Sequence, residues 1–285
     1  MGVITLPGKM MLPRRNDQRP LGKRWDAMSG FLRGAGDIGT PIGSAAGWGH
    51  RRRFVILWFW GAVGAFAGGG LKSADADAPT FAEQVAAVRA GSSTRIRVAD
   101  RALTEEEWKE LATLEVLSYL DLQQGIADDD KAVLLSRLPA LERLVLRESP
   151  LGDEGLRHIA ACHTLRDINL PQARCTLAGL AALAELPRLK NLRLGSPSLC
   201  VEGKGGAELG MTLLQFPALR SLHLIDVPLG DAGLEGIGRY DGLWNLYLDG
   251  AAVSDGAWER YFALHPEVHV HVDQAHHDRD PNRHE

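Results

Sequence analysis

The chain has 285 residues, of which 45% are hydrophobic and 24% are charged. These proportions are those of ordinary globular proteins and exclude a chain that is disordered throughout. Its three cysteines are too few for a disulfide scaffold. The net charge of -4 conceals an asymmetry, because residues 1–53 carry ten Lys/Arg and three Asp/Glu, whereas the remainder carries 22 and 33. The acidic remainder argues against nucleic acid as a partner, which requires a basic face.

Residues 1–53 are rich in Gly, Pro and Arg and show no periodic apolar pattern, so we expect a disordered basic leader there. Three consecutive arginines end this leader, and an uncharged apolar segment follows over residues 54–71. Basic residues before an apolar run are typical of a signal peptide or of a membrane anchor. Residues 72–78 are then expected to be a linker.

The fate of the apolar segment is left open by its sequence. Small residues at Ala65 and Ala67, or at Ala74 and Ala76, suit cleavage by a signal peptidase, which would leave an exported and soluble protein. Without cleavage the segment is close to the roughly 20 residues that span a bilayer. A buried core helix is a third interpretation. The first two predict that the rest of the chain is exported, to the periplasm or the cell surface, and that only an uncleaved segment 54–71 contacts the membrane.

A pattern of the form LxxLxL recurs through the rest of the chain. The residues at its fourth position are Leu120, Leu144, Ile168, Leu192, Leu222 and Leu246, and they are spaced by 24, 24, 24, 30 and 24 residues. Ile96 and Val270 extend the same spacing of 24 by one unit at each end. Alternation in LxL places both leucines on one face of a short strand. The sequence therefore predicts eight units in phase, with one insertion of six residues.

Helical patterns follow the strands of these units. Asp153 and Asp231 stand where a helix N-cap is needed, and Thr104 with Glu107 has the spacing of a capping box. Each unit is thus predicted to contain a strand, a turn and a helix. One such unit cannot bury its apolar edge alone, but stacked units can, so we expect residues 79–272 to fold as one solenoid.

These repeats resemble the leucine-rich repeat family, in the short ribonuclease-inhibitor-like form that occurs in exported bacterial proteins. The resemblance implies an α/β solenoid of about eight 24-residue units, with parallel strands on the concave face and helices on the convex face. The family often places Asn three residues after the last strand leucine, and this chain lacks it. The equivalent residues here are Gly125, Ser149, Ala173, Pro197, Val227 and Ala251. The turns must therefore satisfy their backbone groups in another way.

The concave face of a solenoid is a natural binding surface. Tyr and Arg, which are common interface anchors, occur at its predicted strand positions. The candidate partner-binding residues are Tyr119, Asp121, Arg143, Asn169, Arg193, His223, Asn245 and Tyr247. The sequence predicts a non-enzymatic interaction module that binds a protein or a peptide. The alternatives are a structural envelope-associated repeat protein without a discrete site and, more remotely, a metal-dependent hydrolase.

No catalytic residue and no cofactor are predicted, since neither G-x-S-x-G, H-E-x-x-H nor a paired-Cys motif occurs. His269 and His271 alternate onto one face of the last strand, near His276 and His277, and two imidazoles could hold a divalent metal. No further ligand is fixed by the pattern, so the sequence assigns no metal site. Residues 273–285 are expected to be a disordered, His-rich tail.

Two smaller features complete the repeat region. Cys175 occupies a repeat position that is otherwise apolar, which favours a buried free thiol, with a bridge to Cys200 as the alternative. The insertion contains the letters GKGG, which lack the spacing of a phosphate-binding loop. A functional loop and a tolerated surface bulge are both compatible with it.

Overall fold

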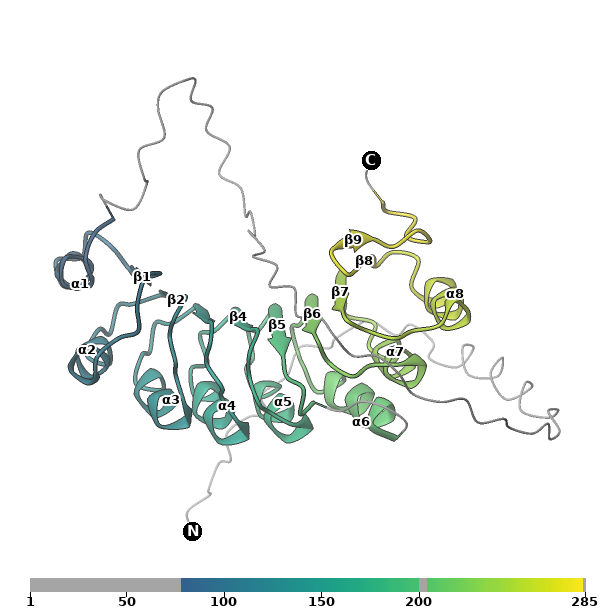
Figure 1. Cartoon of the computed structure of the whole chain (residues 1–285), viewed down its shortest axis with the longest axis horizontal. Coiled ribbons are helices and arrows are strands. Elements are labelled where there is room, and N and C mark those ends of the chain that lie inside the picture. The colour runs from purple at the N-terminus through teal and green to yellow at the C-terminus, as the bar shows by residue number, and fades with distance from the viewer. Residues whose placement is uncertain (1–77, 200–203, 284–285) are drawn as a thin grey trace, which may run out of the picture. The chain divides into compact units, whose positions relative to one another are not determined.

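Short strands and helices alternate along the chain as the repeat predicts (Figure 1). The computed structural model describes residues 78–199 and 204–283, which belong to a unit that spans Gly70–Glu285. Its strands are β1 (Arg95–Val98), β2 (Tyr119–Leu122), β3 (Arg143–Leu146), β4 (Asp167–Leu170), β5 (Asn191–Gly195), β6 (Ser221–Ile225), β7 (Asn245–Asp249), β8 (His269–Val272) and β9 (Ala275–His276). Its helices are α1 (Phe81–Arg89), α2 (Glu105–Leu111), α3 (Asp129–Leu135), α4 (Asp153–Ala160), α5 (Leu177–Leu183), α6 (Lys204–Leu213), α7 (Asp231–Ile237) and α8 (Asp255–Leu264).

The expected leader 1–53, the apolar segment 54–71 and the linker up to residue 77 lie outside the described residues. Within 78–199 and 204–283, no helix combines the length and the apolar character needed to cross a membrane. The expectations of export and of a cleaved or anchoring segment therefore rest on the sequence alone.

The described strands form one sheet in chain order, in which β1 to β8 are parallel and β9 is antiparallel to β8. Ile96 pairs with Leu120 and Leu120 pairs with Leu144, so the repeat lattice is also the register of the sheet. The longer unit does not shift this register, because Leu192 still pairs with Leu222. The prediction of an α/β solenoid with eight units in phase is confirmed. Figure 1 shows helices α2 to α6 along one side and the strands along the other.

The core lies between the strands and the helices. Leu144 and Leu146, the two leucines of one LxL motif, are both 0% exposed, and Leu156 and Ile159 of the following helix are equally buried. Burying one such side chain stabilises a fold by about 1.5–3 kcal/mol. Each repeat buries its leucines against its neighbours, so the described units form a continuous apolar core.

Asp153 and Asp231 were predicted to cap their own helices, and this prediction is wrong. Gly152 and Gly230 are the N-caps of α4 and α7 and make no side-chain cap bond, while Asp153 and Asp231 are the first helical residues. The reason is that each carboxylate points to the next repeat. By contrast, the capping box of Thr104 and Glu107 at α2 is confirmed.

Asp129, the first residue of α3, behaves in the same way, and we call Asp129, Asp153 and Asp231 the aspartate ladder. Asp129 Oδ1 accepts a hydrogen bond from Gly152 N at 2.7 Å. Asp231 accepts hydrogen bonds from the backbone N–H and the hydroxyl of Ser254, both at 2.7 Å. The ladder thus satisfies loop donors across repeat boundaries and so helps to satisfy the loops in the absence of the family's asparagines.

Asp153 makes the largest set of ladder contacts. Its Oδ1 accepts from Thr176 N at 2.7 Å and from Gly179 N at 3.0 Å, and its Oδ2 accepts from the Thr176 hydroxyl at 2.7 Å. A Cβ at Gly179 would lie 2.5 Å from Asp153 Oδ1. Glycine at that helix position is therefore what lets the carboxylate approach.

The six-residue insertion leads into α6, and residues 200–203 lie outside the described part of the chain. Two glycines bring α6 and α7 into backbone contact, since a Cβ at Gly206 would lie 2.2 Å from Ala232 O and one at Gly236 would lie 1.9 Å from Gly206 O. The glycine-rich sequence of this helix is therefore explained by close helix packing, which needs residues without a Cβ at the contact.

The C-terminal end differs from the predicted disordered tail. Val268 and Val270 are buried as expected, but the chain then turns back at Asp273 and Gln274 and adds β9 to the sheet. Asp280, further along this segment, is only 5% exposed. Composition predicted disorder because the segment is polar, whereas the structure holds it through backbone pairing and buried polar contacts.

Candidate partner-binding face

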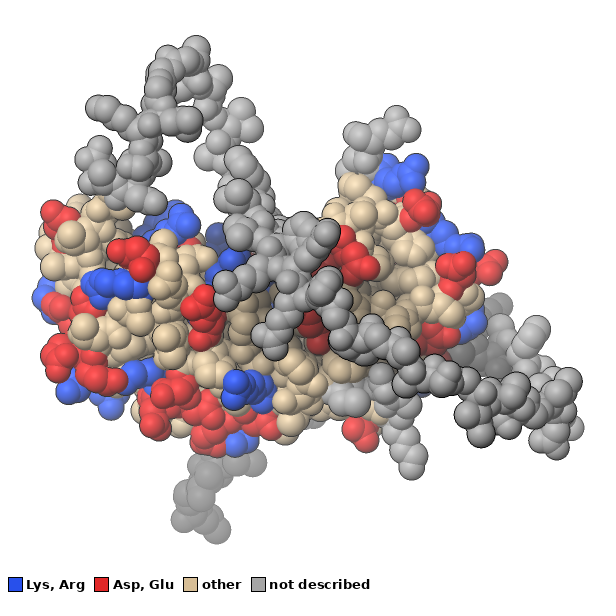
Figure 2. All heavy atoms as spheres, viewed as in Figure 1, with Lys and Arg blue, Asp and Glu red and all other residues tan. Residues whose placement is uncertain are grey.

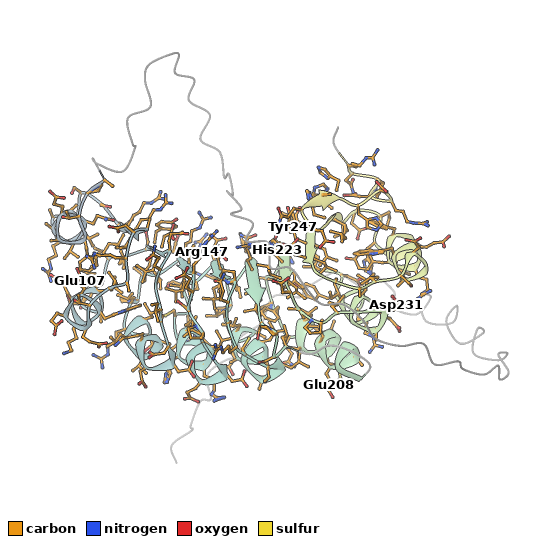
Figure 3. All side chains as sticks on the ribbon, viewed as in Figure 1. Glu107, Arg147, Glu208, His223, Asp231 and Tyr247 are labelled. Atoms are coloured by element: carbon orange, nitrogen blue, oxygen red, sulfur yellow. The ribbon has the colours of Figure 1, made fainter. Side chains whose placement is uncertain are left out.

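The predicted site residues share one face of the sheet. They occupy strand positions that alternate with buried leucines, and the parallel register places them in adjacent rows, as with Asn169 beside Arg193 and His223 beside Tyr247. We call this strand surface the concave face. In Figure 3, His223 and Tyr247 lie on the strand side, whereas Glu208 lies on the helix side.

The N-terminal part of the concave face is centred on Tyr119. The guanidinium carbon of Arg95 lies 4.3 Å from the centre of the Tyr119 ring, and that of Arg143 lies 5.8 Å from it. Both distances suit cation–π contacts. The Tyr119 hydroxyl donates to Asp121 Oδ2 at 3.1 Å. Burial, followed by the negative charge of Asp121, raises the pKa of Tyr119.

The central part is a chain of polar contacts between neighbouring strands. Arg143 Nε donates to Asp167 Oδ2 at 3.1 Å. Arg193 donates to Asn169 Oδ1 at 3.3 Å and to His223 Nδ1 at 3.2 Å. These bonds orient long side chains that would otherwise lose rotamer freedom on binding.

The C-terminal part consists of the rings of His223, Tyr247 and His271 and of the Asp249 carboxylate, which lies against the first of them. His223 Nε2 lies 2.8 Å from Asp249 Oδ2, and the ring centres of His223 and Tyr247 are 5.3 Å apart. The Tyr247 ring lies in turn 4.9 Å from His271. Burial alone would raise the pKa of Asp249, but the hydrogen bond from His223 and the charges of His223 and Arg193 outweigh it, so the pKa is lowered.

Asn245 lies at the start of β7, half-buried, beside Ser221 and His269 in the register. The other seven predicted residues belong to the contact network of the concave face. Asp121 is only 5% exposed, so a partner could hardly reach it, and its role is to position its neighbours.

Two residues that flank the strands are missed by the strand pattern. Trp244, immediately before β7, is 66% exposed, and the Arg220 guanidinium lies 5.7 Å from its ring. Arg147, immediately after β3, has a buried Nε without a hydrogen-bond partner among the described residues. Both lie one residue outside the strands. Examining the positions that flank each strand, such as the W of LWNLYL, would have found Trp244.

The acidic charge of the domain is concentrated away from the concave face. Helices α2, α3 and α4 each begin with acidic residues, namely Glu105, Glu106, Glu107, Asp129, Asp130, Asp153 and Glu154. Figure 2 shows acidic side chains gathered where these helices lie. Negative charge at a helix N-terminus is stabilised by the helix dipole. The concave face carries Arg95, Arg97, Arg143 and Arg193 against Asp121, Asp167 and Asp249, so its arginines slightly outnumber its aspartates.

A parallel sheet of strands in 24-residue register, with a helix in each unit, defines the class of solenoid repeat proteins. The repeats and the fold of the chain are those of leucine-rich repeat proteins. Over 139 residues it is 32% identical to the ribonuclease inhibitor of Sus scrofa, covering 46% of this chain and 25% of that protein. The chain thus matches only a quarter of the length of this curated relative.

Among solved structures, an internalin from Listeria monocytogenes is similar to the chain, with 19% sequence identity and a TM-score of 0.36. The similarity covers 64% of this chain and 59% of the internalin. No protein-family profile matches the chain.

Proposed function

We propose that the chain is a non-enzymatic interaction module that binds a protein or peptide partner through its concave face. The observation that carries this proposal is two groups of side-chain contacts on this face. One joins Tyr119 on β2 through Arg143 to Asp167 on β4, and the other runs from Asn169 on β4 through Arg193 to His271 on β8. Arg and Tyr are enriched among interface hot spots. Because hydrogen bonds and ring contacts already hold these side chains, binding costs little side-chain entropy.

The charge of the face favours a partner that presents acidic groups. Its arginines outnumber its aspartates, although the domain as a whole is acidic. The exposed Trp244 indole, which immediately precedes β7, adds an apolar anchor. A carboxylate-bearing protein surface with an apolar centre would complement both features. The relative from Sus scrofa is named for inhibition of ribonuclease, a protein target, which supports a protein partner.

The proposal is tested by replacing Arg143, Arg193 and Tyr247 with Ala in one variant. Partner capture from an envelope or culture extract, followed by titration of the captured protein, should show at least a roughly 100-fold loss of affinity, since hot-spot truncations typically cost about 2 kcal/mol or more each. Affinity of the unchanged protein should also fall as salt is raised.

A matched control replaces Arg157, Arg188 and Met211 with Ala, because these residues are exposed and lie outside the strands. This control should keep full affinity. If the concave variant captures its partner as well as the control does, the concave-face proposal fails. The outcome would then favour the structural envelope-associated alternative, in which the repeats hold surface components without a discrete site.

We further propose that the repeat domain works outside the cytoplasm. The support is the sequence of segment 54–71 and the three arginines that precede it. Protease added to spheroplasts should digest the domain, and protection of the domain would contradict export. N-terminal sequencing of the mature protein separates the two forms, because cleavage gives a start beyond the apolar run and anchoring retains it.

A further inference from the structure

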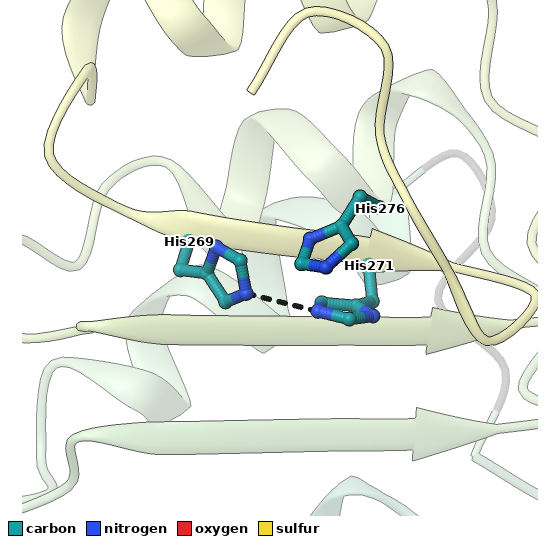
Figure 4. A group of neighbouring side chains, drawn as sticks. All are labelled: His269, His271 and His276. Atoms are coloured by element: carbon teal, nitrogen blue, oxygen red, sulfur yellow. Dashed lines mark hydrogen bonds between the residues drawn. The ribbon is translucent and has the colours of Figure 1, made fainter. Parts of the chain in front are cut away.

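Three histidine side chains meet at the C-terminal end of the sheet. His269 and His271 lie on β8, and His276 lies on β9 (Figure 4). One nitrogen from each ring lies within 4.8 Å of the other two. The His269 Nε2 and His271 Nε2 atoms are 2.9 Å apart. All three rings are half-buried, so their nitrogens converge in a partly desolvated space.

A strained hairpin brings the third histidine into place. Two residues, Asp273 (φ 48°) and Gln274 (φ 69°), connect β8 to β9, and both adopt the left-handed backbone conformation. Two-residue hairpins need this conformation, which usually selects Asn-Gly or Asp-Gly, so a pair without glycine stores backbone strain. The hairpin pairs His271 with His276, and the ring centres of the two are 4.2 Å apart.

A buried carboxylate, that of Asp280, lies against the His269 ring. Asp280 Oδ2 lies 2.8 Å from His269 Nδ1, and the Asp280 side chain is fully buried. The same oxygen accepts a hydrogen bond from Val270 N at 2.9 Å. A carboxylate at Nδ1 selects the tautomer in which Nε2 carries the free lone pair, and this is the usual outer partner of a metal-binding imidazole.

His276, the third histidine, has a buried ring nitrogen, Nδ1, without a hydrogen-bond partner in the described part of the chain. A buried, unpaired imidazole nitrogen costs free energy, and its lone pair can be satisfied by a proton donor or by a metal ion. Three imidazoles packed together cannot all accept protons without repulsion, whereas a metal ion would satisfy their lone pairs at once.

We propose that His269, His271 and His276 form a binding site for a divalent transition-metal ion of the zinc class, with a fourth coordination position left open. Imidazole nitrogens are typical ligands of Zn²⁺, Cu²⁺ and Ni²⁺ and poor ligands of Mg²⁺ and Ca²⁺. Tetrahedral zinc with Zn–N bonds of about 2.0–2.1 Å requires N···N separations of about 3.3 Å. This spacing lies between the 2.9 Å that separates the His269 and His271 nitrogens and the 4.8 Å within which all three ligand atoms fall. The site goes beyond the proposed partner binding and does not depend on it.

The test is calorimetric titration of the full-length protein with Zn²⁺, after treatment with a chelator. We expect one Zn²⁺ per chain and a rise in Tm of roughly 5 °C at a free metal concentration near 100 times Kd. Co²⁺ in place of Zn²⁺ should give visible absorption bands typical of nitrogen ligands. Mg²⁺ should give no heat of binding and no change in Tm. Replacing Asp280 with Asn should weaken binding by about 10–100-fold, since it removes the outer carboxylate.

Two ligand variants and one control distinguish this site from adventitious binding. His271→Asn and His276→Gln should each abolish stoichiometric binding, while far-UV circular dichroism reports whether the repeats stay folded. His163→Ala removes an exposed histidine elsewhere and should bind Zn²⁺ normally. The proposal is overturned if the unchanged protein binds no Zn²⁺, or if the folded His276→Gln variant still binds one equivalent with the same affinity.

Discussion

Replacing Asp153 with Ala is expected to loosen the boundary between two repeats. The change removes three hydrogen bonds that cross this boundary, two to Thr176 and one to Gly179. A hydrogen bond contributes about 0.5–1.5 kcal/mol net, and bonds to a charged acceptor contribute more. Asp153 is half-buried, so solvent screens it in part. We expect the free energy of unfolding to fall by about 2–4 kcal/mol.

The comparison variants separate this loss from general charge effects. Asp130→Ala also removes a carboxylate from the first turn of a helix, but from an exposed position, so it should cost only the helix-dipole contribution of about 0.3–1 kcal/mol. Asp153→Asn keeps an acceptor for both backbone N–H groups and should cost about 1 kcal/mol. The expected order of stability is therefore Asp130→Ala, then Asp153→Asn, then Asp153→Ala.

Urea denaturation followed by circular dichroism measures the global effect, and hydrogen exchange measures the local one. Because repeat arrays can unfold unit by unit, the exchange rates of the Thr176 and Gly179 amides are the more direct readout. Both amides should lose protection in Asp153→Ala and keep it in Asp130→Ala. The interpretation of the ladder is refuted if Asp153→Ala is no less stable than Asp130→Ala and leaves both amides protected.

Two further predictions concern titratable groups. The side-chain hydrogen bond from Arg101, followed by the bonds from Thr104, lowers the pKa of Glu107 against the effect of burial. The contribution of Glu107 to the free energy of unfolding is therefore present above its unfolded pKa and is lost as the pH falls. Glu107→Gln should reduce stability by up to about 1 kcal/mol at pH 7 and by much less near pH 3. An equal loss of stability at both pH values in urea titrations would contradict this. Burial raises the pKa of the Cys162 and Cys175 thiols to about 11. Iodoacetamide at pH 8 should therefore modify them in urea but not in the native protein, and peptide mass mapping measures the modification. Rapid labelling of the native protein would argue against their burial.

Much of the concave face follows from the sequence because strand alternation is local. Once Leu120 and Leu144 are seen to repeat at one interval, the residues between the leucines must share the opposite face, and the register confirms this for each predicted row. Cys175 was likewise predicted to be a core residue from its repeat position, and it is a free thiol with 0% exposure. Cys200, the partner in the alternative of a bridge, lies outside the described residues.

The errors of sequence reasoning have a common physical cause. Asp153 and Asp231 were predicted to cap their own helices because capping preferences describe contacts along one segment. Their actual partners lie in the next repeat, 23 residues or more away, and become neighbours only when the repeats stack.

The basic leader, the acidic remainder and the repeat of 24 residues are all determined by the sequence alone, and the repeat implies the solenoid because leucines at that interval can be buried only by stacking. Only the tertiary structure shows that acidic side chains gather where α2, α3 and α4 begin and that arginines slightly outnumber aspartates on the concave face. It also turns an expected disordered tail into a hairpin that gathers His269, His271 and His276. These features depend on contacts between distant segments, which neither composition nor periodicity encodes.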